Sequence, residues 1–249
     1  MSIITRYIVP DQSIIGLVQS FWMLENTSAS DFEVALLPDG IVDLFLFKEP
    51  DKPVHIVLKG IDTQPSRAVI KGKTKIFATG LRLPAAEFVT ENPVAGFVNN
   101  GHILSPGFWD LSETDLDNFN GYCEKMTEKI KSFSGIELDE RKKKLFRLIY
   151  DSNGDVAINE MADRVGWSSR QINRYFNHQF GISLKAYCGI LRFRASFSHI
   201  KQGKLFPEQG FFDQAHFIRE VKKLAGVLPK ELRENKNDRF LQFRGAGLK

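Results

Sequence analysis

The sequence has few of the residues that build disulfide scaffolds or metal centres. It contains two cysteines, Cys123 and Cys188, which are too few for a disulfide framework and match no metal-binding spacing. None of the five histidines forms an HxH or HxxxH pair with a nearby carboxylate, the clustering that a metal-dependent enzyme needs. We therefore expect reduced thiols, no metal and no other cofactor.

Targeting segments and common catalytic motifs are also missing. No apolar run approaches the ~18 residues of a membrane-spanning helix, and the first residues do not form a signal peptide. No P-loop, GxGxxG or nucleophile elbow occurs. These absences predict a soluble, cytoplasmic protein with no membrane partner, and they argue against an enzyme.

Positive charge is scarce in the first part of the chain and concentrated in the second. From Asp139 onward there are 22 Lys and Arg against 12 Asp and Glu, whereas the preceding residues hold 12 against 18. Such asymmetry is typical of a basic nucleic-acid module joined to an acidic regulatory or assembly module. The simpler alternative is that the basic residues form an ordinary solvated surface that binds no nucleic acid.

Residues 1–110 consist mainly of short apolar runs separated by turn-forming residues. This spacing predicts a sandwich or barrel-like β domain. The run from Ile14 also fits a helical turn at its start, and Pro84–Thr90 predicts a short helix. The predicted strands are Ile14–Leu24, Val34–Leu37, Ile41–Phe47, His55–Leu58, Ala68–Ile70, Lys75–Leu81 and Phe97–Val98.

Residues 111–134 change to a helical pattern. Ser112 followed by Asp115 resembles an N-terminal capping signal. Apolar residues then recur at spacings of three and four, which predicts an amphipathic helix of about six turns over Leu111–Phe133. Two interpretations of this stripe stay open: packing on the chain's own β domain, or a homodimer formed through 112–133 like a short coiled coil.

The pattern beyond residue 135 contains a helix-turn-helix unit. Ile158–Val165 predicts a short helix, and Gly166 supplies the tight turn after it. Ser168 is a good N-cap for a second helix, which ends at Gly181 because glycine readily adopts the left-handed conformation there. The outward face of this helix carries Arg and Asn, which read guanine and adenine edges in a major groove.

The second helix of this unit recurs 45 residues later. Its cap, apolar anchor, outward Arg and terminal Gly recur in order, which an ordinary surface helix has no reason to do. Ser183–Gln202, between the copies, is long enough for one connecting helix of about five turns. The matched pairs include Trp167 and Phe212, Ser168 and Asp213, Ile172 and Phe217, Arg174 and Arg219, and Gly181 and Gly226.

Two such units on one connecting helix, together with the run GFFDQAHFIRE at 210–220, resemble the DNA-binding domain of AraC-type transcription regulators. The resemblance covers about Asp139–Asn235. LPDGIVDLFLF at Leu37–Phe47 and FATGLRL at Phe77–Leu83 are similar to the effector or assembly domains found ahead of such modules. We therefore predict an α+β chain of two domains, with a β-rich domain at 1–110, a linker or dimerisation helix at 111–134, an all-α DNA-binding domain at 135–240 and a tail at 241–249.

The resemblance implies that each recognition helix enters a major groove of double-stranded DNA, the two grooves lying about one helical turn apart. His216 is expected to pack or to contact phosphate rather than read bases. The candidate base readers are Ser169, Arg170, Asn173 and Arg174 in unit one and Gln214, Ile218 and Arg219 in unit two. The candidate phosphate contacts are Lys185, Lys222, Lys223 and Lys230.

The second unit departs from the first in the segment Gly203–Gly210. It holds two glycines and Pro207, so a normal helix of that length does not form. We expect the first helix of unit two to be missing or reduced to a turn, with Leu205 and Phe206 packed against the connecting helix. Ser168–Gly181 is then the main sequence reader.

The function indicated is a sequence-specific DNA-binding regulator, activator or repressor, under control of a small-molecule effector in the first domain. Trp22, Asp43 and Arg82 are the first candidates for the effector pocket. Each also has a structural interpretation: Trp22 as a core ring, Asp43 as a turn or cap partner, and Arg82 as a member of an ion pair. The alternatives are a regulator without a ligand and an adaptor that keeps the fold but binds protein.

Overall fold

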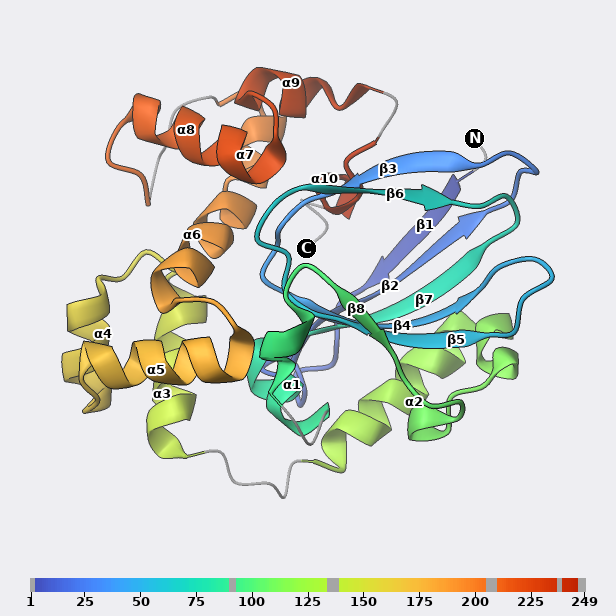
Figure 1. Cartoon of the computed structure of the whole chain (residues 1–249), viewed down its shortest axis with the longest axis horizontal. Coiled ribbons are helices and arrows are strands. Elements are labelled where there is room, and N and C mark those ends of the chain that lie inside the picture. The colour runs from blue at the N-terminus through green and yellow to red at the C-terminus, as the bar shows by residue number, and fades with distance from the viewer. Residues whose placement is uncertain (1–2, 90–92, 134–138, 205–209, 237–238, 246–249) are drawn as a thin grey trace.

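The structure is a computed structural model that describes residues 3–89, 93–133, 139–204, 210–236 and 239–245. A β-sheet part is followed by a helical part (Figure 1), so the predicted α+β class is confirmed. No helix within these ranges is long and apolar enough to cross a membrane.

The main sheet has six antiparallel strands in the order β1-β2-β7-β4-β5-β8, and β3 pairs with β6 in a separate two-stranded ribbon. Side chains alternate between the faces of a strand, and the alternating Val42, Leu44 and Leu46 are fully buried. The strands are β1 (Ile3–Ile8), β2 (Val18–Asn26), β3 (Phe32–Leu36), β4 (Val42–Lys48), β5 (His55–Lys59), β6 (Ser66–Ile70), β7 (Lys75–Leu81) and β8 (Gly101–Ile103).

The structure differs from the predicted strands at three places, and at one of them, the run from Ile14, the alternative of a helical turn is confirmed. β1 was missed, because its half-buried edge lacks a continuous apolar run. The run from Ile14 opens with a helical turn, in which the Val18 amide donates to the Ile14 carbonyl at 2.9 Å. Phe97–Val98 is not a strand: Val94–Phe97 forms a 3-10 helix (η1), and the last strand follows it. The short helix predicted at Pro84–Thr90 is present as α1 (Leu83–Val89).

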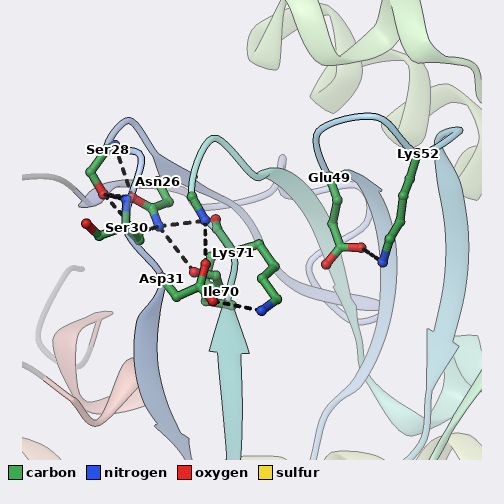
Figure 2. Close-up of polar contacts among 9 residues, drawn as sticks. Asn26, Ser28, Ser30, Asp31, Glu49, Lys52, Ile70 and Lys71 are labelled. Carbon is green, nitrogen blue, oxygen red and sulfur yellow. Dashed lines mark hydrogen bonds and ion pairs between the residues drawn. The ribbon is translucent and has the colours of Figure 1, made fainter.

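A buried asparagine joins the ribbon to the main sheet (Figure 2). The Asn26 side-chain nitrogen lies 2.8 to 3.2 Å from the carbonyl oxygens of Ser30, Ile70 and Lys71. Because it carries two hydrogens, it donates to two of these three oxygens at a time. Its side-chain oxygen accepts from the Ser28 amide at 3.1 Å. Asn26 therefore satisfies backbone groups at both turns that lead into the ribbon.

Helix α2 (Phe119–Lys131) covers one face of the sheet (Figure 1). The Tyr122 hydroxyl lies 2.9 Å from Thr79 Oγ1, and the Phe119 ring lies 5.0 Å from Phe77. The apolar stripe therefore packs on the chain's own β domain, so it does not form a coiled-coil seam. A homodimer through 112–133 stays a prediction.

The predicted six-turn helix at Leu111–Phe133 is too long. Ser112 and Asp115 do form a capping box, but it opens a short 3-10 helix, η3 (Glu113–Asp117). The backbone is extended at Asn118, whose side chain then caps α2. A further 3-10 turn, η2 (Phe108–Asp110), precedes η3. The apolar stripe is therefore divided between η3 and α2.

The helical region does not hold one uninterrupted connecting helix. Ser196 separates two helices because its amide and its hydroxyl both bond back to the Phe193 carbonyl, which tightens the turn. The predicted tail begins with a packed helix, whose Phe243 ring lies 5.5 Å from Phe197. The helices are α3 (Glu140–Asp151), α4 (Ile158–Val165), α5 (Ser169–Phe180), α6 (Leu184–Ala195), α7 (Phe197–Lys201), α8 (Gln214–Ala225), α9 (Pro229–Glu234) and α10 (Leu241–Gly245).

Polar contacts dock the helical region on the β-sheet part. Glu87 on α1 pairs with Lys142 on α3 at 2.6 Å and accepts from the Tyr175 hydroxyl on α5. The Tyr187 hydroxyl on α6 donates to the Gly40 carbonyl at 3.1 Å, and Arg194 donates to the carbonyl of Asp39. These contacts fix α3, α5 and α6 against the first domain.

The end of the chain makes a second connection between the two parts. The Ala35 amide on β3 donates to the Arg239 carbonyl at 2.7 Å, and Ala35 forms a parallel bridge with Phe240. The Leu37 amide donates to the Gln242 side chain at 2.8 Å. The C-terminal segment thus extends the edge of the ribbon and holds α7 beside it.

Candidate nucleic-acid interface

Helices α4 and α5 lie where the first helix-turn-helix unit was predicted, and a tight turn joins them. Gly166 closes α4 with a φ of 75°, a left-handed conformation that favours glycine. Ser168 accepts from the Gln171 amide at 3.2 Å, and Gln171 accepts in return from the Ser168 amide at 2.8 Å. Ala162, Ile172 and the other anchors are buried, so α5 has a fixed orientation.

The outward face of α5 presents two arginines. Arg170 and Arg174 are exposed, and neither guanidinium has an ion-pair partner among the described residues. Asn173 is half-buried and donates to the Ser169 carbonyl at 3.0 Å, while the Ser169 hydroxyl donates to Asn159 at 3.1 Å. The structure thus gathers the four unit-one candidates on one helix. The two arginines have no ion pair among the described residues, whereas Asn173 and Ser169 are hydrogen-bonded within the chain.

The helix predicted to be the recognition helix of unit two is present as α8. Asp213 caps it by accepting from the His216 amide at 2.6 Å, and Gly226 ends it with a φ of 72°. Phe217 and Val221 anchor its inner face. His216 packs 5.7 Å from the Phe211 ring, in line with the packing role predicted for it.

The unit-two candidates are less uniform. Gln214 and Arg219 are exposed, whereas Ile218 is half-buried and packs against the core. Leu205 and Phe206, predicted to plug against the connecting helix, lie outside the described residues. Both α5 and α8 begin on the left-hand side of the molecule in Figure 1, so their N-terminal ends share one side.

All four lysines predicted to contact phosphate are exposed. Lys185 lies in the first turn of α6, Lys222 and Lys223 lie in the last turn of α8, and Lys230 lies at the start of α9. Lys223 lies 3.8 Å from Glu220, a distance that leaves only a weak surface ion pair. Lys222 and Lys223 lie on α8 and Lys230 on the helix that follows it, whereas Lys185 lies beside Asn159 at the start of α4.

In the first domain, the structure brings Trp22 and Asp43 together but not Arg82. The Trp22 Nε1 donates to Asp43 Oδ1 at 3.3 Å. Burial and the neighbouring Asp39 carboxyl raise the pKa of Asp43 to about 7, and burial raises the pKa of Asp39 to about 6. Arg82 donates instead to Gln19 and lies 4.9 Å from the Tyr150 ring.

Sequence reasoning missed the contacts that orient unit one. Gly181 was predicted only as a helix cap, yet a Cβ there would lie 2.7 Å from Val98 Cγ2 and 2.8 Å from the Ala95 carbonyl oxygen. Its second role is to let α5 end against η1. Neither the contact of Gly181 with η1 nor the bonds of Glu87 to Lys142 and Tyr175 have a local sequence signal, because the residues that meet lie far apart in the chain. No metal-binding group of three or more His, Cys, Asp or Glu side chains occurs within the described ranges.

Comparison with known proteins gives one family model and several solved structures. Residues 6–102 match a domain of unknown function, DUF6597. No curated protein matches the chain. The chain is similar to ToxT from Vibrio cholerae, at 13% identity and a TM-score of 0.44, over 93% of this chain and 97% of that one. A ToxT structure with an unsaturated fatty acid bound matches at 11% identity and a TM-score of 0.40, over 93% and 94% of the two chains.

Proposed function

We propose that this chain is a sequence-specific DNA-binding regulator of transcription, of AraC type, in which α5 enters a major groove. The observation that carries the proposal is the exposed pair of arginines on α5, a helix whose opposite face and both ends are fixed. The backbone of a rigid helix is pre-organised for a ligand, and an unpaired guanidinium on it can bind without first breaking an ion pair within the chain. A major groove is wide enough to admit such a helix.

Arg174 is the residue proposed to read a base. Its guanidinium can donate two parallel hydrogen bonds to O6 and N7 of a guanine. Asn173 and Ser169 would first exchange their hydrogen bonds within the chain for bonds to DNA, which lowers their net contribution. Arg170, nearer the start of α5, serves either a neighbouring base or a phosphate.

The second recognition helix, α8, is proposed to enter a second groove on the same side of the duplex. Its support is the common side on which α5 and α8 begin (Figure 1), together with the exposed Gln214 and Arg219. Two grooves on one side of DNA lie one helical turn apart, ~34 Å. Lys185, Lys222, Lys223 and Lys230 would position the protein on phosphates without reading sequence.

For the first domain we propose an effector role, centred on Trp22 and Asp43. A half-buried carboxyl whose pKa is raised, beside an indole, is the kind of group that a polar ligand can bind or ionise. A ligand-free assembly role is the alternative. A shift in melting temperature on adding a ligand, lost in Asp43→Asn, supports the effector role, and a domain that no small molecule stabilises contradicts it.

The test of DNA binding uses sites selected by the full-length protein from a random DNA library. Arg174→Ala is expected to weaken binding to the selected site by ~1–3 kcal/mol, the range for a bidentate base contact, and to change binding to random DNA much less. Arg67→Ala, which removes an exposed arginine on β6, is the matched control. Equal loss on both DNAs would make Arg174 a phosphate contact only.

A further inference from the structure

Phe212 carries an apolar ring that the fold does not use. Its exposed fraction is 94%, against 65% for Ile103, the next most exposed large apolar side chain in the described part of the chain. No described aromatic ring packs on it. The ring is therefore available for contact with another molecule.

The packing role expected at this position is already filled by its neighbour. A residue just before a helix N-cap commonly packs against the fourth helical residue and so fixes the entry of the chain. Here that fourth residue is Phe217, and Phe211 packs on it with ring centroids 5.0 Å apart. Phe212, the residue directly before the cap Asp213, is therefore left over.

Unit one shows what a structural residue at the matching position looks like. Trp167 also directly precedes its cap, but it is half-buried and lies 5.7 Å from the Tyr175 ring. The Arg141 guanidinium covers its other side at 5.2 Å. The two units are therefore unequal here: the unit-one ring is covered, and the unit-two ring is bare.

The backbone that holds Phe212 is ordered and lies at the end of α8 nearest the proposed DNA. Its amide donates to His216 Nδ1 at 3.3 Å, and Asp213 caps the helix. Residues at the start of a recognition helix are the ones that reach base edges. The exposed Arg219 and Lys222 on the same helix complement the charge of DNA rather than that of an apolar protein surface.

We propose that Phe212 is a specificity-determining residue, which packs its ring on the C5-methyl group of a thymine in the groove that α8 enters. Thymine methyl is the apolar feature of the major groove, and phenylalanine is among the side chains that contact it. This proposal rests on the proposed DNA-binding function. It gives unit two a base contact that does not depend on Ile218, which is half-buried.

The test replaces single thymines of a selected site by deoxyuridine, which lacks only the C5-methyl group. For the wild-type protein, one such replacement in the part of the site bound by unit two is expected to weaken binding about fourfold, the factor that corresponds to one buried methyl group. Phe212→Ala is expected to bind the thymine site about as weakly and to show no further loss with deoxyuridine. Ile103→Ala, which removes another exposed apolar side chain, is expected to behave like the wild type.

The outcomes separate the proposal from the function on which it rests. If Phe212→Ala keeps the affinity and the deoxyuridine sensitivity of the wild type, the thymine contact is refuted and DNA binding stands. If Phe212→Ala binds DNA normally but loses transcriptional control in cells, the ring contacts a protein, which also overturns the proposal. If the wild type shows no sequence preference at all, the proposed function fails first. Melting curves of both variants check that the fold is intact.

Discussion

The carboxyl group of Asp43 makes the stability of this protein depend on pH in a direction that can be measured. Asp43 lies on β4, opposite Lys59 on β5 and Gly80 on β7. Burial and the Asp39 carboxyl raise its pKa from 3.8 to about 7. A group with a raised pKa binds its proton more tightly in the folded state, so its ionisation destabilises the fold as pH rises from about 4 to about 7.

The magnitude follows from the size of this shift. About three pKa units, each worth ~1.36 kcal/mol, give an upper limit of ~4 kcal/mol lost between pH 4 and pH 8. Asp39, whose pKa is raised to about 6, contributes in the same direction over the lower part of this range. The two groups interact, so their contributions are shared rather than added.

Asp43→Asn is the perturbation that isolates this effect. Asparagine keeps an oxygen that accepts from Trp22 and removes the charge. We expect the variant to gain about 2–4 kcal/mol at pH 8 and to lose most of the dependence on pH between about 4 and 7. The measurement is urea denaturation of full-length protein at pH 5, 6, 7 and 8.

A matched control is Asp31→Asn. Asp31 is exposed, and its hydrogen bond with Lys71 lowers the pKa of its carboxyl, so removing its charge has the opposite sign and a small effect. If Asp43→Asn leaves the pH profile unchanged, or is less stable than the wild type at pH 8, the carboxyl is hydrated in solution and the reasoning is refuted.

Three further substitutions test other parts of the structure. Arg219→Ala is expected to weaken specific DNA binding less than Arg174→Ala, because unit two departs from the usual pattern; a larger loss would make α8 the main reader. Asn26→Ala leaves several buried backbone groups without a hydrogen bond, so the free energy of unfolding measured in urea is expected to fall by about 2–4 kcal/mol. A fall of less than about 0.5 kcal/mol, as for an ordinary surface substitution, would show that water replaces the amide. Glu87→Ala removes the shared partner of Lys142 and the α5 tyrosine, and about 1–3 kcal/mol of stability should be lost; an unchanged midpoint would contradict the docking role of Glu87.

Local signals predicted the elements that depend on neighbouring residues. Ser168 and Gly181 mark the ends of α5 because capping and left-handed glycine act within one turn of the chain. The spacing of Ile172 and Phe176 gave the buried face of this helix for the same reason. The outward position of Arg174 followed from that geometry.

Features that depend on distant residues were not predictable in this way. Glu87 meets its partners on α3 and α5 across 55 and 88 residues, with no periodicity to announce the contact. The stripe in 111–133 indicated an amphipathic helix, but the break at Asn118, which caps α2, was not predicted. The docking of the chain end on Ala35 and the bare ring of Phe212 likewise follow from tertiary placement.

Salt-dependent, sequence-specific binding to DNA is the property proposed for this protein that one titration measures directly. Full-length protein is titrated against its selected site and against random DNA by fluorescence anisotropy, over a series of salt concentrations. With at least four lysine contacts to phosphate, log affinity should fall with log salt with a slope of roughly −3.6 or steeper, and the selected site should bind ~10³-fold or more tightly than random DNA. Equal affinity for both DNAs, or affinity that does not change with salt, would contradict the central claim.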